Sequence, residues 1–450
     1  MSRDLDMRNP DAGHSSLANL DINVKHLTRV EGHGNIVVDM KNGVLKKAQL
    51  DIVEAPRYFE ALLKGRSFHE AAIITSRICG ICSLGHQLTS LKATEQALGL
   101  SVTPQTVLLR KLLVHGATLQ SNVLHAYFLA APDFLKVKSV IPLVGTHPEV
   151  VLRALRMKKL ANDIGDVVGG RAVHPITCVP GGFTQIPSAS ALRELRRRLV
   201  EDMVPDFLAT VETMKALAGA IPRFERPTEY ISLRSDDDYA LYDGDICSTD
   251  TGRVPDREYR RMTNEFVVPH STSKHCKANR NSYMVGALAR WNNNHDRLCP
   301  EALQAAAALG LEPGCTNPYF NTVAQVVEAG HCALDAVAII DRLLADGLKD
   351  ELPDQEPKQY GTGIGATEVP RGILYHEYTY DRQARVVKAN CIIPTGQNLA
   401  NIDDDMKKLV PEVVAEKSKE EITSWLEMLV RAYDPCISCS VHMLDVQFEE

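Results

Sequence analysis

Hydrophobic residues recur along this chain with two different periods. Residues 24–56 alternate apolar and polar positions around the turn sequence "KNG", which predicts a hairpin in a small antiparallel sheet. Residues 104–130, 188–219 and 318–346 carry apolar residues at helical spacing over long runs, which predicts a bundle of long helices. We therefore expect an α+β fold that is predominantly helical, with a long central helix bundle and small antiparallel sheets at the N-terminus and before the C-terminus.

The remaining segments predict smaller units. Residues 372–394 predict a second hairpin that turns at "DRQ", and residues 404–432 predict a final helix. The polar residues 1–23 predict a flexible leader, and residues 225–300, rich in Asp, Arg, Asn and Tyr, predict a polar surface lobe. Residues 24–442 are then one intergrown domain. The run "GTGIGA" (361–366) precedes a hairpin, so we expect no nucleotide site there, because a phosphate-binding loop needs a following helix.

Composition excludes several classes of partner. The chain has 44% hydrophobic and 24% charged residues and a net charge of −7, which gives no basic surface for nucleic acid. It contains no run of 18 apolar residues and no secretory signal pattern, so we expect no direct membrane span and a cytoplasmic location. Eleven cysteines in 450 residues do not indicate a disulfide framework, since a chain of this length builds a large core.

Two short stretches at opposite ends of the chain carry the same pattern. "RICGICSLGH" (77–86) and "DPCISCSVH" (434–442) each contain two cysteines separated by two residues, with a histidine shortly after. Such a bend holds two thiolates close together and suits a soft metal. Four cysteines could form a structural zinc site, a redox dithiol or an iron–sulfur cluster. Structural zinc sites usually join cysteine pairs about 15–20 residues apart. Pairs at the two ends of the chain therefore favour a catalytic or redox site over a site that only stabilises the fold.

Both stretches resemble the terminal motifs of the large, catalytic subunit of nickel–iron hydrogenases. "LTRVEGHGNI" (27–36), "GGRAVHPITCVPGG" (169–182), "TEVPRGILYH" (367–376) and "CIIPTGQN" (391–398) resemble further blocks of that family. The resemblance favours its cytoplasmic multimeric branch, the methyl-viologen-reducing and heterodisulfide-reductase-associated type. It implies the hydrogenase large-subunit fold and the reversible heterolytic oxidation of dihydrogen to protons and electrons.

The resemblance also implies a ligand set and catalytic residues. Nickel would be bound by Cys79, Cys82, Cys436 and Cys439, and Cys82 and Cys439 would bridge to an iron that carries carbon monoxide and cyanide. Cys436 would be the thiolate that takes the proton. The implied residues around this centre are Glu31 as proton gate, Arg371 after Pro370 over the open metal position, Thr395 donating to a cyanide, His86 beside a sulfur and Asp434 holding Arg371.

A second ion is implied near the C-terminus. Glu60, His442 and the backbone carbonyl of Cys391 match the ligands of magnesium or a similar divalent ion, although a histidine ligand is less typical of magnesium. Without the resemblance, Glu31 would be an ordinary strand glutamate and Arg371 an exposed hairpin arginine. Apart from the four motif cysteines and Cys391, six cysteines have no paired spacing and predict small buried apolar residues: Cys178, Cys247, Cys276, Cys299, Cys315 and Cys332.

Partners follow from the same resemblance. The unpaired cysteines cannot build an iron–sulfur relay, so electrons would leave through an iron–sulfur small subunit, then through further electron-transfer subunits. A maturation endopeptidase would cut after His442 and remove residues 443–450. Two alternatives stay open at this point: a regulatory homologue that senses dihydrogen with the same centre, and a structural zinc protein with four cysteine ligands.

Overall fold

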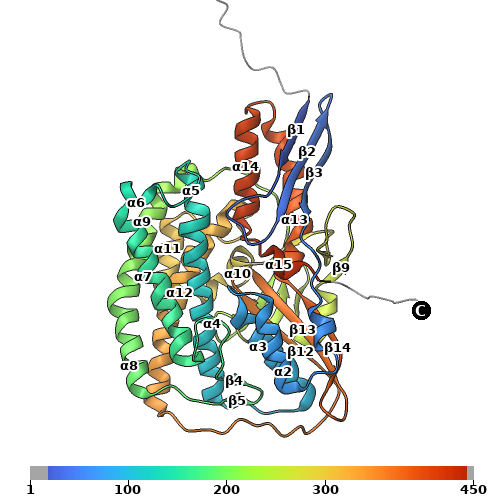
Figure 1. Cartoon of the computed structure of the whole chain (residues 1–450). Helices are drawn as coiled ribbons and strands as arrows, with labels where there is room; N and C mark the ends of the chain where they lie inside the picture. Colours follow the sequence, from blue (N-terminus) through green and yellow to red (C-terminus); the bar gives the residue numbers. More distant parts are fainter. Residues whose placement is uncertain (1–18, 443–450) are drawn as a thin grey trace, which may run out of the picture.

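The computed structural model of this chain describes residues 19–442 and places a bundle of long helices beside several small sheets (Figure 1). The bundle contains α4 (Pro104–Leu124), α7 (Pro148–Gly169), α8 (Ala189–Arg198), α9 (Val204–Leu217), α11 (Pro300–Ala308) and α12 (Asn321–Asp346). Helix α4 packs against α7 and α12. This confirms the predominantly helical α+β class and the three long helical runs.

Two of the long runs contain a π-helical turn. His125–Ala130 follows α4, and Leu199–Met203 joins α8 to α9. Pro132 and Pro205 lie just beyond these turns. Because proline has no backbone N–H, it interrupts the regular helical ladder at these points.

Helix α12 and the turn before it, Pro318–Asp346, are long and apolar enough by composition to cross a membrane. Most of this segment is buried within the bundle, with 78% of its most apolar window inaccessible to solvent. Among the described residues, it is the one segment that meets these criteria. This degree of burial is typical of a helix in the protein core.

The N-terminal sheet has three antiparallel strands, β1 (Leu20–Val24), β2 (Gly34–Lys41) and β3 (Val44–Ile52). Asn42 and Gly43 turn between β2 and β3 with φ of 50° and 74°, as a tight hairpin turn requires. The predicted hairpin is therefore confirmed. The prediction of a flexible leader over residues 1–23 is wrong for residues 20–23, because Leu20 and Ile22 are buried and β1 pairs with β2. Residues 1–18 of that leader lie outside the described residues.

Residues 225–300 do not form the predicted polar surface lobe. They contain a four-stranded sheet in the order β11 (Tyr283–Met284), β6 (Glu229–Arg234), β7 (Asp245–Ser248) and β8 (Gly252–Val254). They also contain the hairpin of β9 (Asn264–Phe266) and β10 (His275–Lys277), and the helix α10 (Ala287–Asn294). The charged residues that dominate the composition pair with each other at the surface, as Arg253 does with Asp236, while Ile231 and Tyr259 are buried.

The predicted second hairpin is confirmed within a three-stranded antiparallel sheet of β12 (Thr362–Val369), β13 (Gly372–Tyr380) and β14 (Val386–Ile392). The glycine-rich run lies in β12, which packs on α3 (Ser83–Leu98). A Cβ at Gly363 would lie 2.2 Å from the Ala93 oxygen, and one at Gly365 would lie 2.1 Å from the Thr89 oxygen. These glycines therefore allow a strand to approach a helix backbone.

The C-terminal segment has two helices where the sequence predicts one. Helix α13 (Pro394–Val413) ends before Ser418, which forms a capping box with Glu421 and starts α14 (Lys419–Ala432). The short helix α15 (Ile437–Ser440) follows. The other short elements are α1 (Phe59–Leu63), α2 (Phe68–Thr75), α5 (Ala131–Phe134), α6 (Leu143–Thr146), β4 (Cys178–Val179) and β5 (Gly182–Phe183).

Candidate metal centre

The two cysteine pairs from the chain ends meet in one buried cluster. Cys79 Sγ lies 3.6 Å from Cys436 Sγ, Cys82 Sγ lies 3.8 Å from Cys439 Sγ, and Cys436 and Cys439 are 2.6 Å apart at sulfur. All four sulfurs lie within 4.8 Å of one another, and all four side chains are buried. All eleven cysteines of the chain are free thiols. The structure thus brings together the predicted quartet.

Backbone hydrogen bonds hold the C-terminal motif against the N-terminal part of the chain. Glu31 donates its N–H to the Pro435 oxygen at 3.3 Å and accepts from the Ile437 N–H at 2.9 Å. Arg57 donates its N–H to the Val441 oxygen at 2.9 Å. Gly32 has φ of +86°, and a Cβ there would lie 2.6 Å from Ile437 Cβ, so only glycine fits this contact. The cysteine cluster is therefore closed by strand-like pairing on both sides of α15.

Contacts within the cluster shift the pKa values of Cys82 and Cys436 in opposite directions. Hydrogen bonds from Cys436, Cys439 and Cys79 lower the pKa of Cys82 well below its usual range. The hydrogen bond with Cys439 is the first of several contacts that raise the pKa of Cys436 well above its usual range. One thiolate therefore forms readily, while Cys436 keeps its proton until a cation arrives, because metal binding releases protons from thiol ligands.

Glu31 contacts both the cluster and the helix that carries it. Its Oε2 atom lies 3.1 Å from Cys436 Sγ and accepts the Ser438 N–H at 3.1 Å. The Ser438 hydroxyl donates to the other carboxylate oxygen. The predicted proton gate thus lies in hydrogen-bond contact with the predicted proton-accepting thiolate.

Arg371 and Asp434 form a buried pair beside the cysteines. Arg371 donates from Nε to the Asp434 backbone oxygen at 2.6 Å and from Nη2 to Asp434 Oδ1 at 2.9 Å. Its third nitrogen, Nη1, is buried and has no partner within residues 19–442. Burial opposes its charge, but Asp434 and the nearby cysteines raise the pKa of Arg371, so the guanidinium stays cationic. Thr395 accepts the Cys436 N–H at 2.9 Å.

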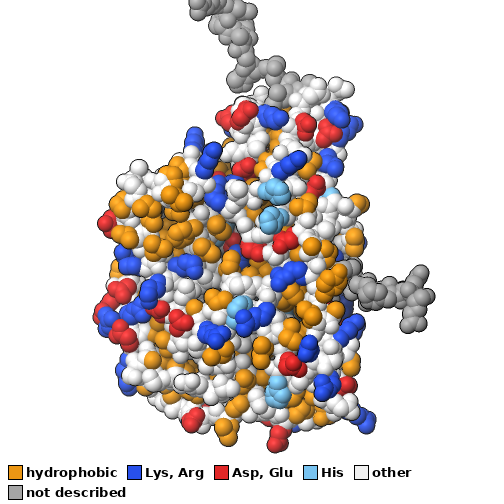
Figure 2. Space-filling model, viewed as in Figure 1, with side chains coloured by type: hydrophobic (Ala, Val, Ile, Leu, Met, Phe, Trp, Pro, Cys, Tyr) orange, Lys and Arg blue, Asp and Glu red, His pale blue; other side chains and the backbone are white. Residues whose placement is uncertain are grey.

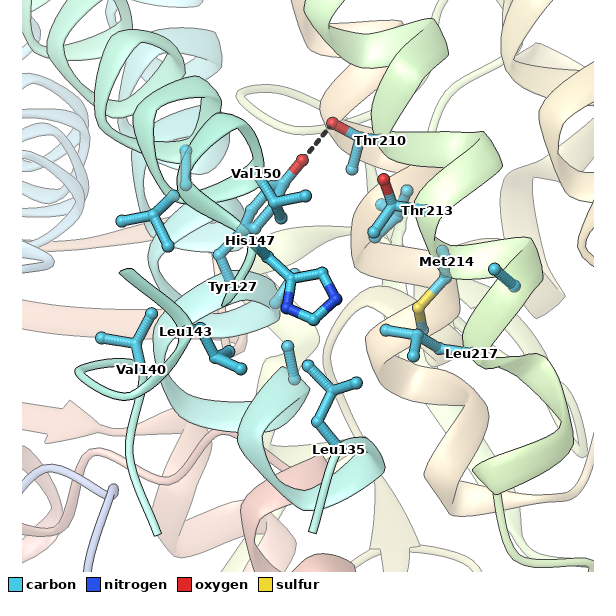
Figure 3. A pocket seen from close by; sticks show the side chains of 16 residues that line it. Tyr127, Leu135, Val140, Leu143, His147, Val150, Thr210, Thr213, Met214 and Leu217 are labelled. Atoms are coloured by element: carbon cyan, nitrogen blue, oxygen red, sulfur yellow. Dashed lines mark hydrogen bonds between the residues drawn. The ribbon is translucent and has the colours of Figure 1, made fainter. Parts of the chain in front are cut away.

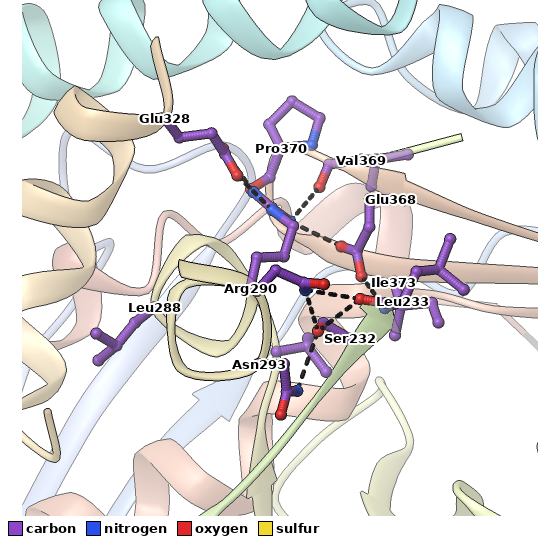
Figure 4. A network of polar contacts seen from close by, with 12 residues as sticks. Ser232, Leu233, Leu288, Arg290, Asn293, Glu328, Glu368, Val369, Pro370 and Ile373 are labelled. Atoms are coloured by element: carbon purple, nitrogen blue, oxygen red, sulfur yellow. Dashed lines mark hydrogen bonds and ion pairs between the residues drawn. The ribbon is translucent and has the colours of Figure 1, made fainter. Parts of the chain in front are cut away.

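A second buried arginine supports the backbone that leads to Arg371 (Figure 4). Arg290, on α10, forms ion pairs with Glu328 and Glu368 and donates to the backbone oxygens of Val369 at 3.1 Å and Pro370 at 3.0 Å. The sequence predicts Pro370 at the metal centre. In the structure, its carbonyl oxygen accepts the hydrogen bond from Arg290. The sequence carries no signal for Arg290 or Glu328, because their partners are distant in the chain.

His86 lies on α3, one turn after Cys82, and begins a chain of buried hydrogen bonds. Its Nδ1 atom is 3.2 Å from His376 Nε2, and His376 Nδ1 is 2.6 Å from the Tyr378 hydroxyl. Burial and the neighbouring His86 lower the pKa of His376 well below its usual range, so this ring stays neutral. The sequence predicts His86 beside a sulfur, and the structure adds His376 and Tyr378 to its surroundings.

The residues predicted for the second ion also meet. His442 Nδ1 lies 2.8 Å from Glu60 Oε1, and Glu60 Oε1 accepts the Cys391 N–H at 3.2 Å. Burial disfavours a charged His442, but Glu265 and Glu60 outweigh it and raise the pKa of that imidazole. Glu265 lies 3.5 Å from His442 Nε2 and pairs with Lys274 at 2.6 Å. Glu265 and Lys274 were not predicted, because they belong to the segment that we expected to form a separate polar lobe.

An apolar cavity of about 300 Å³ lies in the helix bundle, away from these residues (Figure 3). Tyr127, Leu143, Met214 and Leu217 are among its lining side chains, and Tyr127 forms a hydrogen bond with Thr210. Figure 2 shows apolar side chains gathered on the surface over this part of the bundle. The lining residues include neither cysteine nor carboxylate, and His147 is the one common metal-ligand side chain among them.

The four-cysteine cluster fits a soft metal centre. Four buried thiolates carry more negative charge than a dry site tolerates without a cation, and they are donors that soft metals prefer. The unpartnered Arg371 nitrogen adds a buried cationic donor without an acceptor, which fits an anionic group bound at the metal. The arrangement therefore suits a centre that combines thiolates with further small anionic ligands.

Comparisons with known proteins agree with this geometry. The profile of the nickel-dependent hydrogenase family matches residues 57–144 and 284–442, and a HoxL-like profile matches residues 21–55. The chain is 34% identical to the alpha chain of sulfhydrogenase 1 from Pyrococcus furiosus, over 94% of this chain and 98% of that protein. It is 29% identical to a component of the F420-non-reducing hydrogenase from Methanothermobacter marburgensis, over 95% of each chain.

Solved structures give the same fold. The crystal structure of an NAD+-reducing [NiFe]-hydrogenase in the H2-reduced state aligns with a TM-score of 0.84 and 27% identity, covering 94% of this chain and 99% of the other. A [NiFeSe]-hydrogenase from Dm. baculatum aligns with a TM-score of 0.71 and 24% identity over 94% of this chain and all of the other. The second likeness shows the fold alone.

Proposed function

This chain belongs to the nickel-dependent hydrogenase family, and on that premise we propose that it is a hydrogenase catalytic subunit whose metal centre is held by Cys79, Cys82, Cys436 and Cys439. The observation that carries the proposal is the meeting of these four buried sulfurs within 4.8 Å, from opposite ends of the chain. The reaction is the reversible heterolytic oxidation of dihydrogen.

The proposed cofactor is a nickel–iron centre with carbon monoxide and cyanide on iron, which the thiolates of the four cysteines would hold. When bound, this centre supplies an open metal position at which dihydrogen is polarised and split. The buried and unpartnered Nη1 of Arg371 supports a contact with a cyanide, since a guanidinium nitrogen is a strong donor to an anion. Thr395 is the proposed donor to the other cyanide, and its hydroxyl also accepts the Cys436 N–H.

Cys436 and Glu31 are proposed to move the proton. With the centre bound, the Cys436 thiolate would receive a proton released from dihydrogen and pass it to the Glu31 carboxylate, while the two electrons would leave through the partner subunit. The 3.1 Å between Cys436 Sγ and Glu31 Oε2 supports this transfer. The hydrogen bonds from Ser438 hold the carboxylate in this position. Asp434 acts through Arg371, because it fixes the guanidinium with two hydrogen bonds.

Glu60, His442 and the Cys391 carbonyl are proposed to bind a divalent ion, magnesium or a similar one. The 2.8 Å contact between His442 and Glu60 supports a shared ion there. The nearby Glu265 carboxylate adds negative charge, and Lys274 balances part of it. Such an ion would fasten the C-terminal motif. Residues 443–450, proposed as a removable extension, lie outside the described residues.

The proposed partners are an iron–sulfur small subunit, further electron-transfer subunits and a maturation endopeptidase, in the cytoplasm. The relatives support an assembly of several chains, since the Pyrococcus furiosus protein is named as the alpha chain of its enzyme. Six cysteines lie outside the predicted ligand set, and four of them are buried as single thiols: Cys178, Cys247, Cys276 and Cys332. Electrons must therefore leave through clusters on another chain.

The test is dihydrogen-dependent reduction of an artificial electron acceptor by the complex purified without oxygen, with nickel measured in the same sample. We expect sustained turnover and about one nickel per chain. A nickel-loaded complex that binds dihydrogen without turnover would support the sensing homologue instead. One zinc per chain without nickel would support a structural zinc protein.

A further inference from the structure

A second cluster of metal-ligand side chains lies apart from the cysteines. His270 is in the loop between β9 and β10, His275 begins β10, and Asp403 lies on α13. The Asp403 Oδ2 atom is 3.0 Å from His270 Nε2 and 3.4 Å from His275 Nε2. One ligand atom from each residue lies within 4.8 Å of the other two. Two imidazoles from one hairpin thus converge on a single carboxylate oxygen.

These distances match the edges of a metal coordination polyhedron. Tetrahedral zinc with bonds of about 2.0–2.1 Å places neighbouring ligand atoms about 3.3 Å apart. The other oxygen of Asp403, Oδ1, accepts the Leu50 N–H at 2.8 Å, so the carboxylate is fixed with Oδ2 toward the histidines. The 3.4 Å between His275 Nε2 and Asp403 Oδ2 is longer than a usual hydrogen bond, so the protein alone engages this nitrogen only weakly.

Burial and access also fit an ion. The side chains of His275 and Asp403 are 3% and 5% exposed, whereas that of His270 is 21% exposed and opens the cluster to solvent. Two imidazole nitrogens and one carboxylate oxygen that face one point are a donor set that a divalent cation binds, with release of any ligand protons. Two nitrogen donors and one oxygen donor favour a borderline transition ion over magnesium or calcium.

Another His–Asp group in this chain lacks such convergence. His115 Nε2 lies 2.6 Å from Asp335 Oδ2, and the ring of His331 is nearby. His331 Nδ1, however, accepts the Cys299 N–H at 3.2 Å, so this nitrogen is already engaged elsewhere. This group provides a matched control, because it has the same residue types without three converging ligand atoms.

We propose that His270, His275 and Asp403 bind one divalent transition ion, with zinc as the expected species, at a site distinct from the cysteine cluster and from the Glu60–His442 site. The ion would fasten the β9–β10 hairpin to α13. The same loop bonds to β3 through the Thr272 N–H and the Ile52 oxygen at 3.1 Å, and to α15 through the Ser273 hydroxyl and the Ser440 oxygen at 2.9 Å. The bound ion would therefore stabilise the position of the segment next to Cys439.

The test is a titration of the purified, chelator-treated hydrogenase complex with Co2+ alone, followed by the visible absorption of tetrahedral cobalt as a difference spectrum. We expect one saturable site per chain, and displacement of the cobalt by Zn2+. His275→Gln and Asp403→Asn should each weaken cobalt binding at least about tenfold, as should His270→Gln. His115→Gln should retain the binding.

His270→Gln keeps the test decisive if the buried substitutions prevent folding, because His270 is the most exposed of the three ligands. No saturable cobalt absorption in the wild-type complex would overturn the proposal. Equal binding by the wild type and His270→Gln would also overturn it, since the ion would then lie elsewhere on the surface. The readout is cobalt absorption rather than turnover, so this failure is distinguishable from failure of the proposed hydrogenase function.

Discussion

Two buried arginines near the metal centre differ in how completely their donors are used. Arg290 has five hydrogen bonds, two to Glu328, one to Glu368 and two to backbone oxygens, which accounts for every N–H that a guanidinium carries. Arg371 bonds only to Asp434 and leaves Nη1 without a partner in the described part of the chain. All donors of Arg290 are used within the protein, whereas Nη1 of Arg371, close to the cysteines, remains available to a bound group.

The largest expected effect comes from removing one of the four cysteine ligands that lie beside Arg371, the arginine with an unused donor. Cys82→Ser replaces the thiol with the lowered pKa by a hydroxyl that does not ionise near neutral pH. We expect loss of bound nickel and a fall in dihydrogen oxidation of at least about a hundredfold, since loss of a direct ligand exceeds loss of its supporting contacts. Metal analysis and the acceptor assay measure both effects.

Cys178→Ala is the matched control, because Cys178 is also a buried thiol but lies outside the quartet. It should retain nickel and activity. Nickel content in Cys82→Ser equal to that of the wild type would contradict the assignment of this ligand.

The next effect concerns the network of Arg290 with Glu328 and Glu368, in which every guanidinium donor is used. Arg290→Met leaves Glu328 and Glu368 buried without their cation, and breaking a buried pair in this way costs about 3–5 kcal/mol of folding free energy. We expect a large drop in the unfolding temperature of the complex. Arg196→Met, which removes an arginine paired with Asp341 at the surface, should leave that temperature unchanged. Equal unfolding temperatures for Arg290→Met and the wild type would remove the contrast between the two arginines.

The same network should also make stability depend on pH. Burial raises the pKa of Glu368 to about 7, against the opposing charge of Arg290, from an ordinary value of 4.5. The folded state therefore favours the protonated carboxyl, which stabilises the fold below about pH 4.5 and loses that contribution as the pH rises through 7. The contribution is at most about 3 kcal/mol.

Glu368→Gln removes this titration. Its unfolding temperature should fall less steeply than that of the wild type between about pH 4.5 and 7, the interval between the two pKa values. Unfolding curves measured across this interval test the difference. Parallel pH profiles for the two proteins would show that Glu368 does not titrate there.

The smallest expected effect sharpens the comparison at Arg371. Arg371→Lys keeps a positive charge near Asp434 but removes the planar group that presents Nη1. We expect dihydrogen oxidation to fall about ten- to hundredfold, as for loss of a supporting contact at a metal centre. The unfolding temperature should change less than in Arg290→Met. A larger change in the unfolding temperature than in activity would show that Arg371, like Arg290, has a structural role.

The sequence predicts the parts of this site that lie in contiguous motifs. The cysteine pairs, Glu31 and Arg371 each belong to a short stretch that resembles a known block, and the hairpins and long helices follow from simple periodicity. Arg290 could not be predicted, because its partners Glu328 and Glu368 lie far away in the chain. Glu265 and Lys274 pair with each other across the β9–β10 hairpin, but the local composition there indicates only a polar surface. The polarity of residues 225–300 comes from surface ion pairs and hides the buried strands.

The central claim is that the thiolates of both chain ends hold a nickel–iron centre with carbon monoxide and cyanide on iron. Infrared spectroscopy of the nickel-loaded complex in the carbonyl and cyanide stretching region tests it most directly. We predict one carbonyl band and two cyanide bands that shift when dihydrogen is added. A metal-replete complex without these bands would contradict the account.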